Sequence, residues 1–201
     1  MTGLRPALCV LDNSVLSDLH FGDLLRLLGA LAFRTIVPDA VYDGHTRVGG
    51  AALTVETLGA WGLEVRGTGP DGVSRVAELV RDNPSLSTPD HFALVTAEEC
   101  EGLLLTGDRN LRSLAERLGV QTHGVLWVFD ELVNSALLDP ATAITRLTMV
   151  MAHNLRLPGS ECHKRLIHWQ ERVDRGASSA FYLRQAFPRF ARDPGDETLM
   201  D

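Results

Sequence analysis

The sequence predicts an α/β protein in which helices cover both faces of a central parallel sheet, giving three layers. Short apolar runs alternate along the chain with segments of helical spacing, which is typical of parallel sheets. The first run, residues 7–11, is apolar at every position, as expected of a strand buried on both faces. After Pro140 such runs stop, so we expect a C-terminal α-helical extension beyond the α/β domain.

Strands are predicted where these short runs are bounded by polar or turn residues. Pro38 ends the second strand and can also open a helix, because the first helical turn needs no amide hydrogen there. Gly49 and Gly50 interrupt the chain before the next helix. The five predicted strands cover residues 7–11, 35–37, 63–66, 103–106 and 120–122.

Helices are predicted between the strands, where apolar residues recur at spacings of three and four. The clearest helix start is Ser87-Thr88-Pro89-Asp90, which supplies a capping hydroxyl, a proline and a first-turn acid. In the α/β region the helices cover residues 14–20, 24–32, 39–45, 51–58, 73–81, 88–101, 111–118 and 125–133. Helices over 141–154, 161–175 and 180–187 follow, so we divide the chain into a domain, 1–138, and a helical, basic extension, 139–201.

Charge is distributed unevenly between these two parts. The net charge is −7, yet residues 146–192 carry nine basic and three acidic side chains, against 10 basic and 18 acidic in residues 1–138. A basic segment on an acidic body keeps nucleic acid open as a partner. The three cysteines lack CxxC spacing, and the chain shows neither a secretory leader nor a membrane span, so we expect a cytoplasmic protein that uses no membrane.

Three acids stand at positions where a parallel sheet could bring them together. Asp12 follows the first strand, Asp108 follows the fourth, and Asp90 lies in the first turn of a helix. Carboxyl ends of parallel strands share one edge of the sheet, where α/β folds bind their ligands. Carboxylates that share a site raise one another's pKa unless a cation such as Mg²⁺ or Mn²⁺ lies between them. The alternative is a local role for each acid: Asp12 simply caps the following helix, Asp90 complements the helix dipole as a first-turn acid, and Asp108 does either.

Four stretches resemble the PIN domain family, the metal-dependent nuclease fold of many VapC-type toxins. They are residues 10–16, 37–42, 86–93 and 105–112, and the resemblance covers roughly residues 7–135. It implies a small α/β/α domain that cleaves RNA at a Mg²⁺ or Mn²⁺ site. It further implies that Asp12, Asp90 and Asp108 hold the cation, that Thr106 orients Asp108, and that Asn13 or Ser14 supports Asp12.

One position departs from the family pattern. Three residues after Val41 the family usually has a glutamate, and this chain has Gly44. The neighbouring Asp43 is the candidate replacement as a fourth catalytic acid, with Asp39 and Glu56 as weaker candidates. This departure leaves open a catalytically silent, PIN-like module that binds RNA or protein.

The extension interleaves cations with aromatic residues, and three interpretations stay open for it. Such a pattern can hold single-stranded RNA, with cations on phosphates and rings on bases. The aromatic residues can instead pack against the domain, or the segment can bind a dimer mate or an antitoxin. His163 and His168 are five residues apart and do not share a helix face, so we expect no metal role for them.

The sequence therefore predicts a metal-dependent endoribonuclease acting on single-stranded or structured RNA, with Mg²⁺ or Mn²⁺ as cofactor. The expected partners are RNA, a small antitoxin protein and a second copy of the chain. A phosphatase or nucleotide-binding protein is disfavoured, because no DxD pair follows the first strand and no glycine-rich phosphate loop is present.

Overall fold

The computed structural model describes residues 8–42, 47–48, 51–52 and 54–186. At its centre is a five-stranded sheet in the order β5-β2-β1-β6-β7, with every neighbouring pair parallel. The predicted α/β class with a central parallel sheet is confirmed. The strands are β1 Leu8–Leu11, β2 Arg34–Pro38, β5 Leu63–Arg66, β6 Leu103–Leu105 and β7 Thr122–His123.

The strand order reverses between β1 and β6. From β1 the chain adds β2 and then β5 on one side, and later adds β6 and β7 on the other. β1 and β6 pair in register, with Cys9 opposite Leu103 and Leu11 opposite Leu105. In open α/β sheets such a reversal creates a crevice at the carboxyl ends of the strands, and ligands bind there. The end of β1 is therefore the topologically favoured place for a site.

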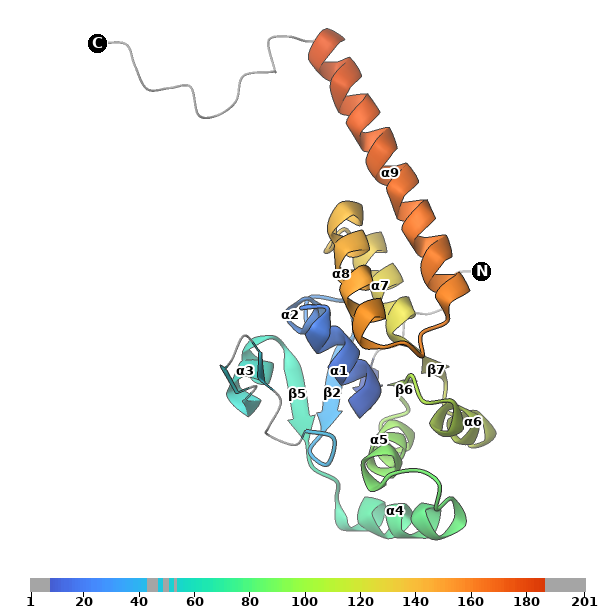
Figure 1. Cartoon of the computed structure of the whole chain (residues 1–201). Helices are drawn as coiled ribbons and strands as arrows, with labels where there is room; N and C mark the ends of the chain where they lie inside the picture. The colour runs from blue at the N-terminus through green and yellow to red at the C-terminus, as the bar shows by residue number, and fades with distance from the viewer. Residues whose placement is uncertain (1–7, 43–46, 49–50, 53, 187–201) are drawn as a thin grey trace, which may run out of the picture.

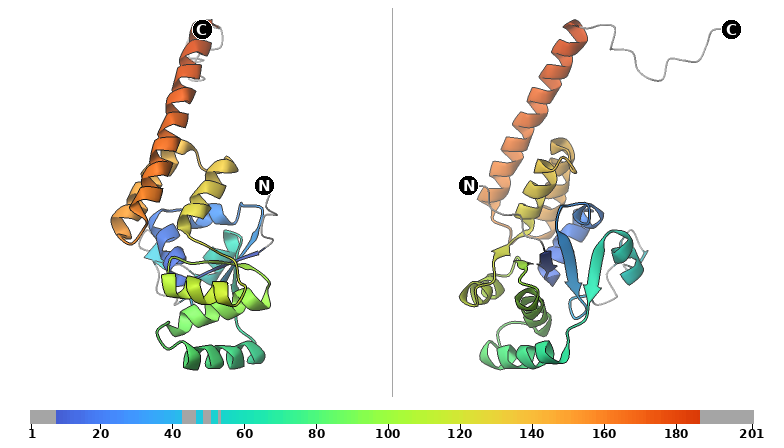
Figure 2. Two further views of the ribbon diagram at one scale, coloured as in Figure 1. Left: turned by 90° about the vertical axis from the view of Figure 1, so that its right-hand side faces the viewer. Right: turned by 180° about the vertical axis from the view of Figure 1, so that it is seen from behind.

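Helices cover the sheet on both sides (Figures 1 and 2). On one side α5 packs on β1, β2 and β6, with α4 outside it and α6 beside it. On the other side α1 packs against α7 and α8, α2 packs against α7, and α3 packs on the edge strand β5. These helices are α1 Asn13–Phe21, α2 Leu25–Leu28, α3 Val55–Ala60, α4 Pro70–Asp82, α5 Thr88–Glu99, α6 Arg109–Arg117, α7 Val125–Asn134 and α8 Pro140–His153.

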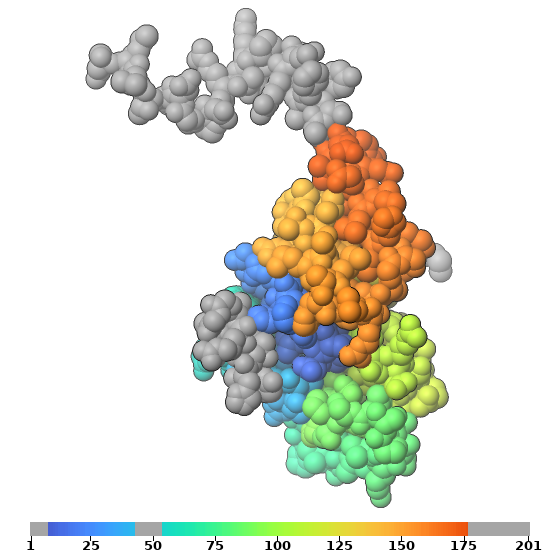
Figure 3. Space-filling view, viewed as in Figure 1, coloured from blue at the N-terminus to red at the C-terminus, as the bar shows by residue number. Residues whose placement is uncertain are grey.

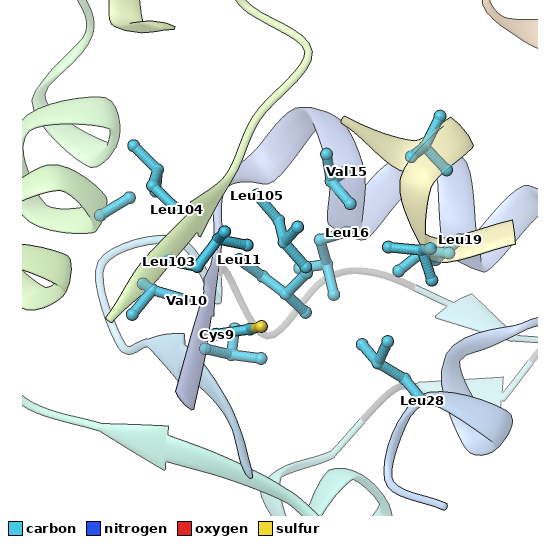
Figure 4. Close-up of a cluster of buried hydrophobic side chains, with 14 of the residues drawn as sticks. Cys9, Val10, Leu11, Val15, Leu16, Leu19, Leu28, Leu103, Leu104 and Leu105 are labelled. Atoms are coloured by element: carbon cyan, nitrogen blue, oxygen red, sulfur yellow. The ribbon is translucent and has the colours of Figure 1, made fainter. Parts of the chain in front are cut away.

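The two central strands supply the middle of the core (Figure 4). Cys9, Val10 and Leu11 of β1 are fully buried, and Leu104 and Leu105 of β6 are equally inaccessible. Because successive side chains of a strand point to opposite faces, consecutive burial requires helices on both faces. This is why the apolar runs in the sequence show no alternation. The cysteines Cys9, Cys100 and Cys162 are free thiols.

Two predicted helices differ from the structure, the first throughout its described part and the second at its start. Residues 39–42 of the predicted helix 39–45 form only a turn, in which the amides of Val41 and Tyr42 both bond to the Pro38 carbonyl. Residues 43–46 lie outside the described residues. In the predicted helix 51–58, β4 (Ala51–Ala52) instead pairs with β3 (Arg47–Val48), and α3 begins only after Thr54, whose hydroxyl caps it.

A third predicted helix is shorter than expected. The predicted segment 24–32 is reduced to the four residues of α2. At Gly29 the chain passes so close to Trp61 that an added Cβ would collide with the Trp61 carbonyl oxygen. This tertiary contact with the end of α3 takes the place of further helical turns.

The extension begins with α8, which packs on the domain. Ala143, Leu147 and Val150 are fully buried, and α8 packs on α1 and α7. The α/β domain and α8 thus share one core, and the boundary at residue 138 stays a prediction. Among the described helices, none has the length and apolar character that crossing a bilayer would require.

The last helix, α9, runs from Gly159 to Ala186 without a break. The sequence predicted two helices, 161–175 and 180–187, and this separation is wrong. Gly176 and the serines that follow lower helix propensity but do not stop a helix as a proline would, and no proline occurs between Pro158 and Pro188. The start of α9 packs on α8, and its later part extends beyond the body (Figures 1 and 2).

Candidate active site

Asp12 lies where β1 ends and α1 begins, at the reversal point of the sheet. Its amide donates to the Leu105 carbonyl of β6 at 3.1 Å, which continues the sheet pairing by one residue. Its carboxylate caps α1 by accepting from the Val15 amide at 2.8 Å. The Ser14 and Thr106 hydroxyls also donate to it, and only 1% of the residue is exposed. The site therefore begins with a carboxylate that is buried and held by three donors.

Burial raises the pKa of Asp12 to about 6. Loss of water contact is the largest cause, and the hydrogen bonds from Thr106, Val15 and Ser14 oppose it. The charge of Asp90 raises the pKa of Asp12 further, so the two carboxylates lie within each other's electrostatic reach. The site thus holds negative charge that would be stabilised by a cation.

Thr106 joins the ends of the two central strands. Its hydroxyl donates to Asp12 and accepts from the amide of Asp108 at 3.0 Å. Next to it, the Gly107 amide donates to the Ser14 hydroxyl at 2.8 Å. An added Cβ at Gly107 would lie 3.1 Å from that hydroxyl oxygen, so the loop passes close to α1. Asp12 and Asp108 therefore stand on either side of one hydroxyl group.

Asp108 caps α6. Its Oδ1 accepts from the amides of Asn110 and Leu111 at 2.8 and 2.9 Å. No described residue bonds to its Oδ2, which leaves one oxygen for a ligand. The residue is half-buried.

Asp90 forms a capping box at the start of α5. Its Oδ2 accepts from the Ser87 amide at 3.0 Å and from the Ser87 hydroxyl at 2.7 Å. Its Oδ1 accepts no hydrogen bond from any described residue. Asp12 and Asp108 thus cap helices, and Asp90 lies in the first turn of α5 as the partner of the Ser87 cap, while Asp90 and Asp108 each keep one oxygen without a described hydrogen bond.

The predicted site residues fall into three groups. One hydrogen-bonded network contains Asp12, Ser14, Thr106 and Asp108. Asp90 acts on this network through its charge, which raises the pKa of Asp12. Asn13 is exposed and makes no described bond to Asp12, so Ser14 alone is the neighbouring support. Asp43 and Gly44 lie outside the described residues. The weaker candidate Glu56 is exposed in the first turn of α3, beside the edge strand.

The donor chemistry of the site suits a hard divalent cation. Mg²⁺ and Mn²⁺ prefer carboxylate oxygens, and Mg²⁺ takes few protein ligands and keeps several waters. Asp12 supplies a carboxylate that burial penalises, and Asp90 and Asp108 supply unbonded oxygens. Within the described ranges, however, no three His, Cys, Asp or Glu side chains lie close enough to hold an ion by themselves. The described residues therefore offer the ligand type that the cation prefers, but they do not form a complete set of ligands around it.

One residue that contacts the site was not found by sequence reasoning. Arg112 donates from Nη2 to the Thr106 carbonyl at 2.9 Å and so holds the peptide between the two acids. Its position four residues after Asp108, on the same face of α6, was the available signal.

The chain is matched by a family of known proteins. A family model described as a PIN domain matches residues 8–171, which is most of the chain. The chain belongs to the PIN domain family, so the predicted resemblance is confirmed, and the match continues through α8 into α9. PIN domains are generally nucleases and typically use divalent metals.

The chain matches no curated protein. Among solved structures it is similar to a PilT N-terminus domain protein from the hyperthermophilic archaeon Sulfolobus solfataricus. The two share 20% identity over 65% of this chain and 93% of the other, with a TM-score of 0.39.

Proposed function

We propose that this chain is a metal-dependent endoribonuclease whose active site lies at the carboxyl ends of β1 and β6. The observation that carries the proposal is the buried Asp12, joined to Asp108 through the Thr106 hydroxyl at the reversal point of the sheet. A buried carboxylate whose pKa is raised both by burial and by a second carboxylate is typical of a functional site.

Each residue has a definite role in this proposal. Asp12, Asp90 and Asp108 hold the cation, and Asp43 is the candidate fourth acid. When bound, Mg²⁺ or Mn²⁺ activates water and stabilises charge on the phosphodiester. Ser14 and Thr106 fix the orientation of Asp12, and Arg112 fixes the Thr106 peptide. RNA as the substrate, in preference to DNA, is supported by the family resemblance alone.

The second candidate function is a catalytically silent module that binds RNA or protein. Two observations favour it: Gly44 stands where the family usually has a glutamate, and no three-ligand group forms among the described residues. The two candidates differ in one measurable property, which is the binding of Mn²⁺ to the carboxylates.

The proposal is tested by RNA cleavage and by metal binding. We expect the protein to cleave single-stranded RNA with Mn²⁺, EDTA to stop the reaction, and Asp108→Asn to slow it by about 100-fold or more, as expected for loss of a metal ligand. Asp139→Asn is the matched control, because Asp139 caps α8 in the same way, outside the site. If Asp108→Asn cleaves as fast as the wild type, the assignment is wrong. Calorimetry that detects RNA binding but no Mn²⁺ binding would support the silent module.

We extend the proposal to a toxin role, because many VapC-type toxins have the PIN domain fold. Induced expression should then arrest growth, and Asp12→Asn should remove the arrest. A small antitoxin should bind the wild type and the variant equally. Growth arrest that persists with Asp12→Asn would show that RNA cleavage at this site is not the cause.

A further inference from the structure

The first half of α9 carries three basic side chains along one line. His168, Arg172 and Arg175 are separated by four and three residues. Because successive helical residues are about 100° apart, the three fall within a sector of about 60° and span about 10 Å along the axis. We call these residues the α9 cationic stripe.

The two arginines of the stripe lack carboxylate partners among the described residues, unlike the cations that precede them. Arg165 holds Asp130 of α7 with contacts of 2.9 and 2.6 Å, and Lys164 pairs with Glu161 at 2.7 Å. Arg172 makes no hydrogen bond or ion pair with any described residue. Arg175 donates only from Nε, to the Glu171 carbonyl at 3.2 Å. Both guanidinium groups are therefore available to an outside anion.

The acids of the same helix do not neutralise the stripe. Asp174 lies about 100° from the nearest stripe residue and accepts from Gln170 at 2.9 Å. Glu171 borders the stripe, but no ion pair among the described residues joins its carboxylate to Arg172 or Arg175. The stripe therefore keeps its positive charge in an acidic protein.

The stripe rests on a fixed stretch of helix. One residue after His168, Trp169 is 2% exposed and its ring lies 5.9 Å from that of Phe129. The core thus anchors the helix on one side while the basic side chains stay open.

The stripe is separate from the candidate active site. The strands β2 and β5 point their carboxyl ends toward α4 and α5, whereas α9 extends from the opposite end of the molecule (Figure 1). The space-filling view likewise shows α8 and α9 at one end and α4 and α5 at the other (Figure 3). A ligand on the stripe would therefore bind outside the site of cleavage.

We propose that the α9 cationic stripe binds phosphate groups of single-stranded RNA and anchors it outside the cleavage site. Guanidinium groups match phosphate in geometry and stay charged at all relevant pH values. The acidic body, with 18 acidic and 10 basic side chains in residues 1–138, repels a polyanion. The α9 cationic stripe therefore offers an RNA chain a local positive charge on an acidic protein. The choice of RNA rests on the proposed function.

The test measures RNA binding without metal, using the full chain and a labelled single-stranded oligonucleotide in EDTA. The variant is Arg172→Gln with Arg175→Gln. The matched control is Arg81→Gln with Arg117→Gln: Arg81 also bonds a carbonyl four residues earlier, and both control residues are exposed on other helices. Losing two phosphate contacts should lower the salt slope by about 1.4 and weaken binding about 25-fold at 0.1 M salt.

Three results would overturn the proposal. The first is a stripe variant whose dissociation constant and salt slope equal those of the wild type. The second is a control variant that loses as much RNA affinity as the stripe variant. The third is wild-type protein that binds polyglutamate as tightly as it binds RNA. The last would indicate a surface for acidic proteins. Arg172→Lys with Arg175→Lys, which keeps the charge, should keep the salt slope.

Cleavage assays separate this inference from the proposed function. With Mn²⁺, the stripe variant should raise KM while kcat stays unchanged, because the stripe holds RNA away from the reacting bond. Asp108→Asn should still bind RNA in EDTA but fail to cleave it. If neither the wild type nor any variant cleaves RNA, the nuclease assignment is overturned. If RNA binding still depends on the two arginines in that case, the proposal that the stripe binds RNA is kept.

Discussion

At the scale of single residues, burial of the Asp12 carboxylate lowers the free energy of unfolding at pH values above the pKa of the unfolded chain. Its pKa is raised from 3.8 to about 6, so the folded protein keeps a proton that the unfolded chain releases between these values. Stability should therefore fall as pH rises from about 4 to 6 and stay low above that. At 1.36 kcal/mol per pKa unit, the full effect is on the order of 3 kcal/mol.

Asp12→Asn should remove this pH-dependent loss. We expect the variant to gain on the order of 2–3 kcal/mol over the wild type between pH 4 and pH 8, measured by urea unfolding. Asn keeps an acceptor for the Val15 amide, so the cap of α1 survives. Asp139→Asn should instead lower the free energy of unfolding at neutral pH, because hydrogen bonds from Thr142 lower the pKa of Asp139 and so stabilise its charged form in the folded protein. A difference between Asp12→Asn and wild type that is the same at pH 4 and pH 8 would show that the buried Asp12 charge does not cause the loss.

Metal binding should reverse the penalty of the buried charge. An ion that binds only the folded protein at 100 times its dissociation constant adds about 2.7 kcal/mol to the free energy of unfolding. We therefore expect Mn²⁺ to raise the urea midpoint of the wild type at pH 7.5 and to leave that of Asp12→Asn unchanged. An equal rise of the urea midpoint in the wild type and in Asp12→Asn would show that Mn²⁺ binds at a site that does not include Asp12.

At the scale of elements, Thr106 couples the ends of β1 and β6. Thr106→Val removes a donor to Asp12 and an acceptor for the Asp108 amide, which should cost about 1–3 kcal/mol and reduce RNA cleavage. Thr106→Ser should restore both properties because it keeps the hydroxyl. Thr35→Val on β2 is the control: Thr35 is buried and its hydroxyl lacks a described partner, so its loss should be neutral or stabilising. Equal effects of Thr106→Val and Thr35→Val would show that the Thr106 hydroxyl does not join the strands.

At the scale of the whole molecule, α8 belongs to the core that also supports the site. Leu147 is fully buried and α8 packs on α1, the helix that Asp12 caps. Leu147→Ala should lower the free energy of unfolding by about 2–5 kcal/mol in one cooperative transition. Met149→Ala, on the exposed side of α8, should cost far less. Two separate unfolding transitions would instead favour an independent domain ending near residue 138.

The sequence alone determined the features that depend on local patterns. Apolar runs located the central strands, and the capping positions of Asp12, Asp90 and Asp108 followed from spacing, because a cap bonds only within its own first turn. The family motifs lie at these same local positions. The predicted helix 24–32 was too long because a distant contact intervenes: the chain passes close to Trp61 at Gly29. The predicted break in α9 was wrong for a local reason, because Gly176 and the serines after it do not stop a helix.

Only the tertiary structure decided what these local features do together. Pairing of β1 with β6 places the Thr106 hydroxyl, 94 residues away in sequence, on the Asp12 carboxylate. Burial by both helical layers raises the pKa of that carboxylate, and ion pairs with α7 and within α9 neutralise some cations and leave Arg172 and Arg175 open. Charge and burial depend on which segments meet in space, and one-dimensional spacing does not contain that information.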